Sequence, residues 1–154
     1  MKIVIAEKPD QAAKLAAPFS FTKKTGYFEI KANTYFPNGA LITWAIGHLC
    51  ELKAPEEYNP TWKKWTLDTL PIIPERFEYK VSKSKYKQFN VIKNLVKRPD
   101  IQEIIIGGDA GREGELIIRT ILKVCGVNKP MRRLWISSLT ENAVKNGFSH
   151  LLPE

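Results

Sequence analysis

The sequence has no long hydrophobic run. No apolar stretch among its 154 residues approaches the roughly 20 consecutive residues that a membrane-spanning helix needs. The amino terminus reaches an acidic residue at Glu7, which does not suit a secretory signal peptide. We therefore predict a cytoplasmic protein that does not enter a membrane.

Cysteine and histidine are scarce, with two residues of each. Cys50 and Cys125 lie far apart and form no metal-ligand pattern, so we expect two buried free thiols in a reducing compartment. His48 is a candidate acid or base, but no serine or cysteine nucleophile motif accompanies it, which favours a structural hydrogen-bonding role. The chain has no internal repeat and no low-complexity linker. One compact domain over residues 1–154 is predicted.

Acidic residues are fewer than basic ones, 16 against 24, and the net charge is +8. Residues 79–100 hold most of the excess, with seven basic residues against one acidic residue. A block this uneven predicts a nucleic-acid backbone as partner. The alternative is a solvated helix face, because the same stretch has an apolar side. That side comprises Tyr86, Phe89, Val91, Ile92, Leu95 and Val96. Both interpretations hold together if the apolar side faces inward and the lysines face outward.

The most informative stretch is residues 104–115, Ile-Ile-Ile-Gly-Gly-Asp-Ala-Gly-Arg-Glu-Gly-Glu. Its three isoleucines predict a short strand buried on both faces of a parallel sheet, with Asp109 just past the carboxyl end. Apolar residues recur at helical spacing from Glu113 onward, so a helix follows the turn. A second apolar run, residues 3–6, ends at Glu7, and Pro9 suits the first turn of the helix after it.

In open α/β sheets the functional crevice lies outside the carboxyl ends of the strands, near the point where strand order reverses. If the two strands are neighbours, Glu7 lies near Asp109 and Glu113. Clustered carboxylates raise each other's pKa unless a cation compensates them, and oxygen ligands of this kind favour Mg²⁺. Beside a metal and a phosphate, Arg112 becomes a bidentate clamp.

A simpler interpretation assigns these acids to structure. Acidic residues at a helix start complement the helix dipole, and Asp109 can be a turn or capping residue. The whole string favours a ligand site instead, because its glycines allow the backbone to approach a ligand closely. These glycines are Gly107, Gly108, Gly111 and Gly114.

Residues 20–80 read as strand-like and turn-rich. Strands are expected at residues 27–30 and 33–36, followed by a hairpin turn before residues 41–44. We interpret this segment as an insertion into an α/β core formed by residues 1–20 and 80–150. The predicted fold is a mainly parallel sheet of about four strands flanked by helices. The tryptophans are expected to anchor the core or loops rather than to stack on bases. They are Trp44, Trp62, Trp65 and Trp135.

A series of short motifs spans essentially the whole chain. They are Ala6-Glu7-Lys8-Pro9, Trp44-Ala45-Ile46-Gly47-His48-Leu49 followed by Glu51-Leu52, Pro55-Glu56-Glu57-Tyr58, Trp62 and Trp65, Leu70-Pro71-Ile72-Ile73-Pro74, the acidic turn, and Ser137-Ser138-Leu139-Thr140. In this order they resemble the Toprim domain of bacterial type IA DNA topoisomerases of the topoisomerase III kind. The resemblance implies a Toprim, Rossmann-like fold.

The resemblance also implies roles for individual residues. Glu7, Asp109 and Glu113 would hold Mg²⁺, and Lys8 would contact the scissile phosphate. Arg112 and Glu115 complete the family's acidic turn. Where the family usually has a second aspartate this chain has Gly111, so we expect weaker metal binding, with water or Glu115 in the vacant place.

The reaction that the resemblance implies is cleavage of one DNA strand by a tyrosine, passage of another strand and religation, without ATP. None of the five tyrosines has the sequence context of the family's nucleophile. They are Tyr27, Tyr35, Tyr58, Tyr79 and Tyr86. The chain is therefore expected to be one domain of a larger nucleoid enzyme, inactive alone. Its expected partners are the phosphate backbone of single-stranded DNA and the remaining domains.

Two other functions use similar residues. A stand-alone Toprim nuclease or primase-like enzyme would use the same acids, with water or a nucleotide as the reacting partner. The Gly-His-Leu motif and the tryptophan-rich middle argue against it. A small-molecule nucleotide-binding domain is disfavoured because the turn lacks the Gly-x-Gly-x-x-Gly spacing and carries carboxylates where a pyrophosphate would lie.

Overall fold

A computed structural model describes residues 1–47, 49–60, 79–108 and 111–153. Its main sheet has seven strands in the order β2-β3-β4-β1-β7-β8-β9. Four neighbouring strands run parallel: β4 (Ala40–Trp44), β1 (Lys2–Ala6), β7 (Glu103–Ile106) and β8 (Met131–Arg133). Antiparallel strands extend both sides, namely β2 (Phe21–Lys24), β3 (Tyr27–Ile30) and β9 (Leu152–Pro153). The predicted α/β class and parallel centre are confirmed, although the sheet has more strands than expected.

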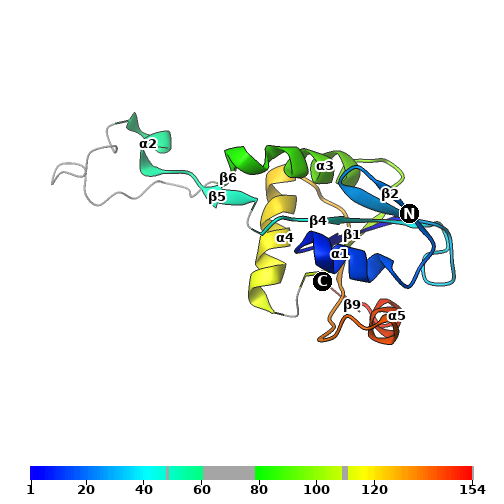
Figure 1. The fold of residues 1–154 in the computed structure, drawn as a ribbon. Helices are drawn as coiled ribbons and strands as arrows, with labels where there is room; N and C mark the ends of the chain where they lie inside the picture. The colour runs from blue at the N-terminus through cyan, green and yellow to red at the C-terminus, as the bar shows by residue number, and fades with distance from the viewer. Residues whose placement is uncertain (48, 61–78, 109–110, 154) are drawn as a thin grey trace.

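Helices cover both faces of this sheet. On one face lie α1 (Pro9–Ala16) and α5 (Glu141–Ser149), and on the other lie α3 (Tyr86–Val96) and α4 (Arg112–Cys125). Figure 1 shows α3 and α5 on opposite sides of the sheet. Successive side chains of β1 alternate between the faces, so Ile3 packs with α3 and α4 whereas Val4 packs with α1. None of the described helices is long and apolar enough to cross a bilayer.

A small second sheet extends from the body of the molecule. It pairs β5 (Cys50–Leu52) with β6 (Tyr79–Val81) in antiparallel register, and helix α2 (Pro55–Tyr58) follows β5. Figure 1 shows these elements projecting away from the main sheet. Lys80 Nζ donates to Glu57 Oε1 at 2.7 Å, which joins α2 to β6. The 3-10 helix η2 (Lys83–Lys85) then leads into α3.

The expected insertion at residues 20–80 differs from the structure in its first half. Strands β2, β3 and β4 belong to the main sheet, and β4 is a central strand that pairs parallel with β1. Among the described residues of this segment, only β5, α2 and β6 form structure outside the main sheet. A hairpin was expected before β4, and the strand that pairs antiparallel with β4 is β3. The parallel pairing with β1 involves residues far away in sequence and leaves no local signal.

The strand expected at residues 33–36 is not formed. These residues belong to the loop between β3 and β4, where Asn33 Oδ1 accepts the backbone N–H groups of Tyr35 and Phe36 at 2.8 and 3.0 Å. An asparagine side chain that bonds the following backbone competes with strand pairing. The loop ends at Gly39, whose φ of +77° favours glycine. The hairpin itself is present, with a longer loop than the sequence suggested.

Both cysteines are buried and free, as predicted. Burial raises the pKa of the Cys50 thiol and of the Cys125 thiol to about 11. Each thiol is therefore protonated at neutral pH and contributes to the core as a small apolar side chain.

Candidate active site at the carboxyl edge of the parallel strands

Strand order reverses between β1 and β7. From β1 the chain passes through α1 and later reaches β4 on one side, whereas from β7 it passes through α4 to β8 on the other side. The two helices cover opposite faces of the sheet. The carboxyl ends of β1 and β7 therefore flank the place where open α/β sheets form their ligand crevice. The neighbour relation required by the sequence argument is confirmed, because β1 and β7 pair in parallel with Ile5 opposite Ile106.

Glu7 directly follows β1 and is only 9% exposed. Its backbone N–H donates to Gln11 Oε1 at 2.8 Å, and Gln11 is itself buried. Lys8 is exposed at the N-cap of α1, and Pro9 is the first residue of that helix, as predicted. Gln11 was not predicted as part of this site. Its position four residues after Glu7, on the helix that follows the strand, is a signal that could have revealed it.

The glycines after β7 have a packing role. The N–H of Gly107 donates to the carbonyl of Ile5 at 2.8 Å. A Cβ at Gly107 would lie 2.9 Å from Val4 Cγ1, and one at Gly108 would lie 3.1 Å from the carbonyl oxygen of Gly114. Close approach of β7, β1 and α4 therefore accounts for these two glycines without a ligand.

The three-carboxylate metal site stays a prediction. Arg112 and Glu113 are exposed in the first turn of α4, and Glu7 ends β1 at the same edge of the sheet. Asp109 lies outside the described residues, and so does His48. Within the described part of the chain, no three His, Cys, Asp or Glu side chains gather in a way that could hold a metal.

Glu115 is engaged by two arginines. Arg119 Nε donates to Oε1 at 2.7 Å, and Arg133 Nη1 donates to Oε2 at 3.4 Å. The hydrogen bond from Arg119, helped by the positive charges of both arginines, lowers the pKa of the Glu115 carboxyl below its usual range. Because Arg133 belongs to β8, this pairing joins the first turns of α4 to the sheet. It also argues against Glu115 as a replacement metal ligand, since both carboxylate oxygens already accept a guanidinium hydrogen bond.

A shallow hollow lies beside this ion-pair group. Ile106, Gly108, Glu115, Arg133, Leu134 and Trp135 line it. The N–H of Leu134 donates to the carbonyl of Ile106 at 2.9 Å, which continues the β7–β8 pairing to the edge of the sheet. Trp135 follows and is 49% exposed.

The tryptophans were expected to anchor the core or loops. Trp44 fits this role, because it packs on Phe28 with 5.4 Å between ring centroids, but Trp135 is outside the core. Trp62 and Trp65 lie outside the described residues.

Residues 2–139 match the profile of the Toprim domain. The chain belongs to the Toprim domain family. It is 47% identical over 152 residues, or 98% of its length, to "DNA topoisomerase 3" of Bacillus thuringiensis (strain Al Hakam). It is 45% identical over 151 residues, or 97% of its length, to the protein of the same name from Shouchella clausii (strain KSM-K16). The chain spans 20% of the length of each of these relatives.

A solved structure agrees on the fold. The full-length topoisomerase I from Thermotoga maritima superimposes with a TM-score of 0.58 at 19% sequence identity. The match covers 99% of this chain and 21% of that protein. The resemblance inferred from the short motifs is therefore confirmed at the level of family and fold.

Gly111 of this Toprim chain has room for a side chain. Among the described residues, no atom beyond its chain neighbours lies within 4 Å of the position that a Cβ would occupy there. Its φ of 162° and ψ of 167° are extended and open to any residue. Gly111 therefore differs from Gly107 and Gly108, because neither packing nor backbone conformation requires glycine at this position.

The basic segment of the Toprim domain has the two-sided character that was predicted. Helix α3 buries Phe89, Ile92, Leu95 and Val96, while Lys87 and Lys97 are exposed. Tyr86 was assigned to the apolar side, but it is 52% exposed at the start of the helix and contacts Phe89 only edge to face. Gln88 is buried instead. Its Nε2 donates to the carbonyl of Trp44 at 2.8 Å, a link to β4 that the sequence analysis missed.

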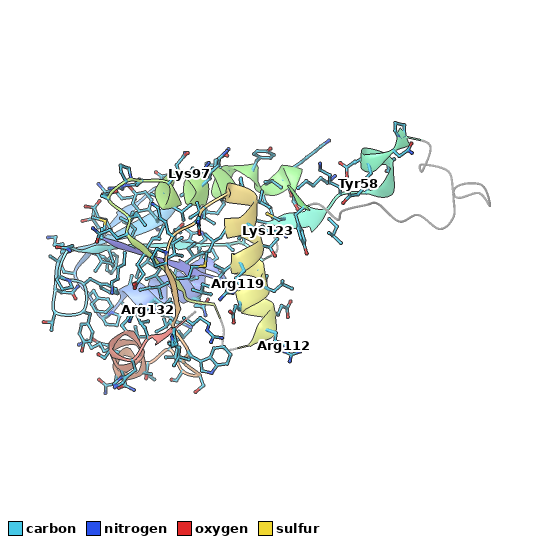
Figure 2. All side chains as sticks on the ribbon, turned by 180° about the vertical axis from the view of Figure 1, so that it is seen from behind. Tyr58, Lys97, Arg112, Arg119, Lys123 and Arg132 are labelled. Atoms are coloured by element: carbon cyan, nitrogen blue, oxygen red, sulfur yellow. The ribbon has the colours of Figure 1, made fainter. Side chains whose placement is uncertain are left out.

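Helix α4 extends this basic surface toward the acidic turn. Arg112, Arg119 and Lys123 follow one another along it at positions that share one helix face (Figure 2). Lys97 and Lys123 both lie on the side of the sheet that carries α3 and α4. Lys123 Nζ is 5.9 Å from the ring centroid of Tyr79 in β6. Basic side chains thus lie on both helices of this side, and Arg119 among them pairs with Glu115.

Proposed function

We propose that this Toprim chain is part of a type IA DNA topoisomerase, the class that cuts one DNA strand, passes another through the break and reseals it without ATP. In this proposal Glu7, Asp109 and Glu113 hold Mg²⁺. The observation that carries it is the position of Glu7, a nearly buried carboxylate at the carboxyl end of β1, beside the strand that leads into the acidic turn. The matching relatives named DNA topoisomerase 3 support the assignment.

The donor chemistry fits Mg²⁺. Glu7 and Glu113 offer carboxylate oxygens from the ends of two elements at one edge of the sheet, and Mg²⁺ takes few carboxylates while keeping several waters. A bound Mg²⁺ supplies positive charge that offsets these carboxylates and polarises a phosphate oxygen.

The basic residues of the site would bind the DNA phosphate. Lys8 is exposed at the amino terminus of α1, where the helix dipole also favours an anion. Arg112 is exposed in the first turn of α4, and its planar guanidinium suits bidentate contact with phosphate oxygens. In this proposal these residues position the phosphate. A tyrosine hydroxyl from another part of the enzyme bonds to phosphorus and gives up its proton, the bond from phosphorus to the 3′ oxygen breaks, and a 3′ hydroxyl leaves. Arg112 and Lys8 contribute charge and orientation, not the nucleophile.

Titration calorimetry with Mg²⁺ tests this assignment on the chain itself. Glu7→Gln should abolish or greatly weaken Mg²⁺ binding, because it replaces a charged oxygen donor with a neutral amide of the same shape. Glu29→Gln is the matched control, since Glu29 is exposed on β3 in the antiparallel part of the sheet. Equal Mg²⁺ affinity in the wild-type protein, Glu7→Gln and Glu29→Gln would contradict the proposed metal site.

A further inference from the structure

Trp135 lies at the same edge of the sheet as Glu7. It follows β8, and the strand pairing places Arg133 opposite Ile106 and Leu134 beside the end of β7. Trp135 therefore lies level with the glycine turn, and it shares a hollow with Gly108. Strands two places apart in a sheet are separated by about 10 Å. The ends of β1 and β8 are related in this way, with β7 between them.

The indole ring is supported on the protein side. The guanidinium carbon of Arg133 lies over the ring, 6.0 Å from its centroid. Arg133 is itself held, because Nη1 donates to Glu115 at 3.4 Å and Nε donates to the carbonyl of Pro153 at 3.3 Å. A cation over an aromatic face orients the ring. About half of the Trp135 surface nevertheless remains exposed to solvent.

We propose that Trp135 stacks against a base of the single-stranded DNA whose phosphate lies at the Glu7 site. This inference rests on the proposed function and adds a base contact to it. An aromatic ring beside fixed arginines is the combination that proteins use to bind single strands without sequence preference. At the stacked spacing of about 3.4 Å per nucleotide, a strand covers the distance from β1 to β8 in about three nucleotides.

The surroundings of Trp135 favour DNA over a protein segment as the occupant. Arg133 precedes it by two residues and Arg119 reaches the same ion-pair group from α4, whereas Arg132 pairs with Glu103. Glu115 neutralises one of these two arginines, so this group keeps one net positive charge. The hollow contains backbone, carboxylate and guanidinium groups beside the apolar Ile106 and Leu134, so it is not an apolar groove that calls for a hydrophobic helix.

Binding of two oligonucleotides of equal length tests the proposal. One is oligothymidylate and the other has the same sugar-phosphate chain without bases; affinity is measured by fluorescence anisotropy at low salt. Trp135→Ala should weaken oligothymidylate binding by roughly tenfold, equivalent to about 1.4 kcal/mol, and leave the abasic strand unaffected. Trp135→Phe keeps an aromatic face and should retain most of the affinity. Phe21→Ala is the control, because Phe21 is 42% exposed on β2, at the far edge of the sheet.

The other outcomes separate this inference from the proposed function. If Trp135→Ala lowers the affinity for both oligonucleotides equally, or lowers neither affinity, stacking would be overturned. If Lys8→Ala weakens the binding of both oligonucleotides while Trp135→Ala changes the binding of neither, only the stacking inference fails. If the wild-type chain binds neither oligonucleotide at low salt, the DNA partner fails and stacking fails with it. Thermal melting of each variant checks folding. Should Trp135→Ala unfold, Trp135→Leu provides the test, because it keeps an apolar side chain without an aromatic face and should weaken oligothymidylate binding alone.

Discussion

The backbone of Glu7 is held by a residue four positions along the chain. Gln11 Oε1 accepts its N–H at 2.8 Å, and both residues are buried. A buried N–H without a partner costs about 1–3 kcal/mol, so Gln11 stabilises the conformation in which the chain leaves β1. The backbone conformation at Glu7 thus depends on Gln11, a neutral side chain that takes no direct part in the proposed chemistry.

At the residue scale, Gly111 leads to the first prediction. Gly111→Asp should tighten Mg²⁺ binding by on the order of tenfold, because it adds a carboxylate where the family usually has one. The structure adds that this change should be tolerated, since the backbone is extended and the Cβ position is open. Titration calorimetry measures the affinity, and thermal melting measures the stability.

Gly111→Asn is the matched control, because it adds the same volume without the charge. If Asn and Asp tighten Mg²⁺ binding equally, charge is not the cause. If neither variant changes the affinity, Gly111 does not lie against the metal position.

Individual side-chain partners were the hardest feature to predict from the sequence. Glu7 was singled out because it ends a short apolar strand, which is a local pattern, whereas Lys8 was singled out only through the family resemblance. The pairing of Glu115 with Arg133 joins residues 18 positions apart, and Gln88 reaches Trp44 across 44 positions. Such contacts depend on how strands and helices pack in space, and no spacing rule within one element encodes them.

At the scale of elements, β1, α1, β7 and α4 were predictable because each has a short apolar run or helical periodicity with clear ends. Strand β4 was recognised as a strand but not as a central one. Its residues Ala40–Ile42 are buried on both faces, the pattern of a parallel strand, but a hairpin turn precedes it and suggested a local β insertion. The strand expected at residues 33–36 does not form, because the Asn33 side chain hydrogen-bonds the backbone of the residues that follow it.

The contact between α4 and β8 leads to the second prediction. Glu115→Gln should lower the free energy of unfolding at pH 7 by about 1 kcal/mol, because it weakens charge-assisted bonds to Arg119 and Arg133. Glu141→Gln is the control, since Glu141 pairs with Lys145 at 3.8 Å on the exposed surface of α5 and should contribute little. Denaturant unfolding of the three proteins measures the difference.

The same pair predicts a pH dependence. The pKa of Glu115 is lowered in the folded protein from an ordinary value of 4.5. A lowered pKa means that the stabilisation is complete above about pH 4.5 and is lost as the pH falls through the folded-state value. The difference in unfolding free energy between the wild type and Glu115→Gln should therefore shrink in acid. A difference that stays constant from pH 7 to pH 3 would show that the carboxylate charge is not responsible.

At the scale of the whole molecule, the sheet edge would position the metal and the phosphate, and the basic residues would attract the DNA backbone. Glu7 follows β1 beside β7, the strand that precedes α4, and basic residues lie on α3 and α4 on one side of the sheet. Each lysine or arginine that neutralises a phosphate releases condensed counterions, so DNA affinity falls as salt rises. We therefore expect the chain to bind DNA weakly, with strong salt dependence and little sequence preference.

The last prediction is that this binding does not lead to cleavage. The acids and Lys8 supply charge and position for a phosphate, but breaking the phosphodiester bond also needs an attacking group, which we assign to a tyrosine outside this chain. Supercoiled plasmid incubated with the chain and Mg²⁺ should remain supercoiled while its gel mobility is retarded at low salt. Nicked product that increases with protein concentration and disappears in Glu7→Ala would instead indicate a metal-dependent nuclease that uses water as the nucleophile. Loss of nicking in Glu7→Ala would exclude a contaminant, and the Glu29→Gln control excludes a general effect of charge, because a nuclease that uses Glu7 would keep its activity when an acid remote from Glu7 is neutralised.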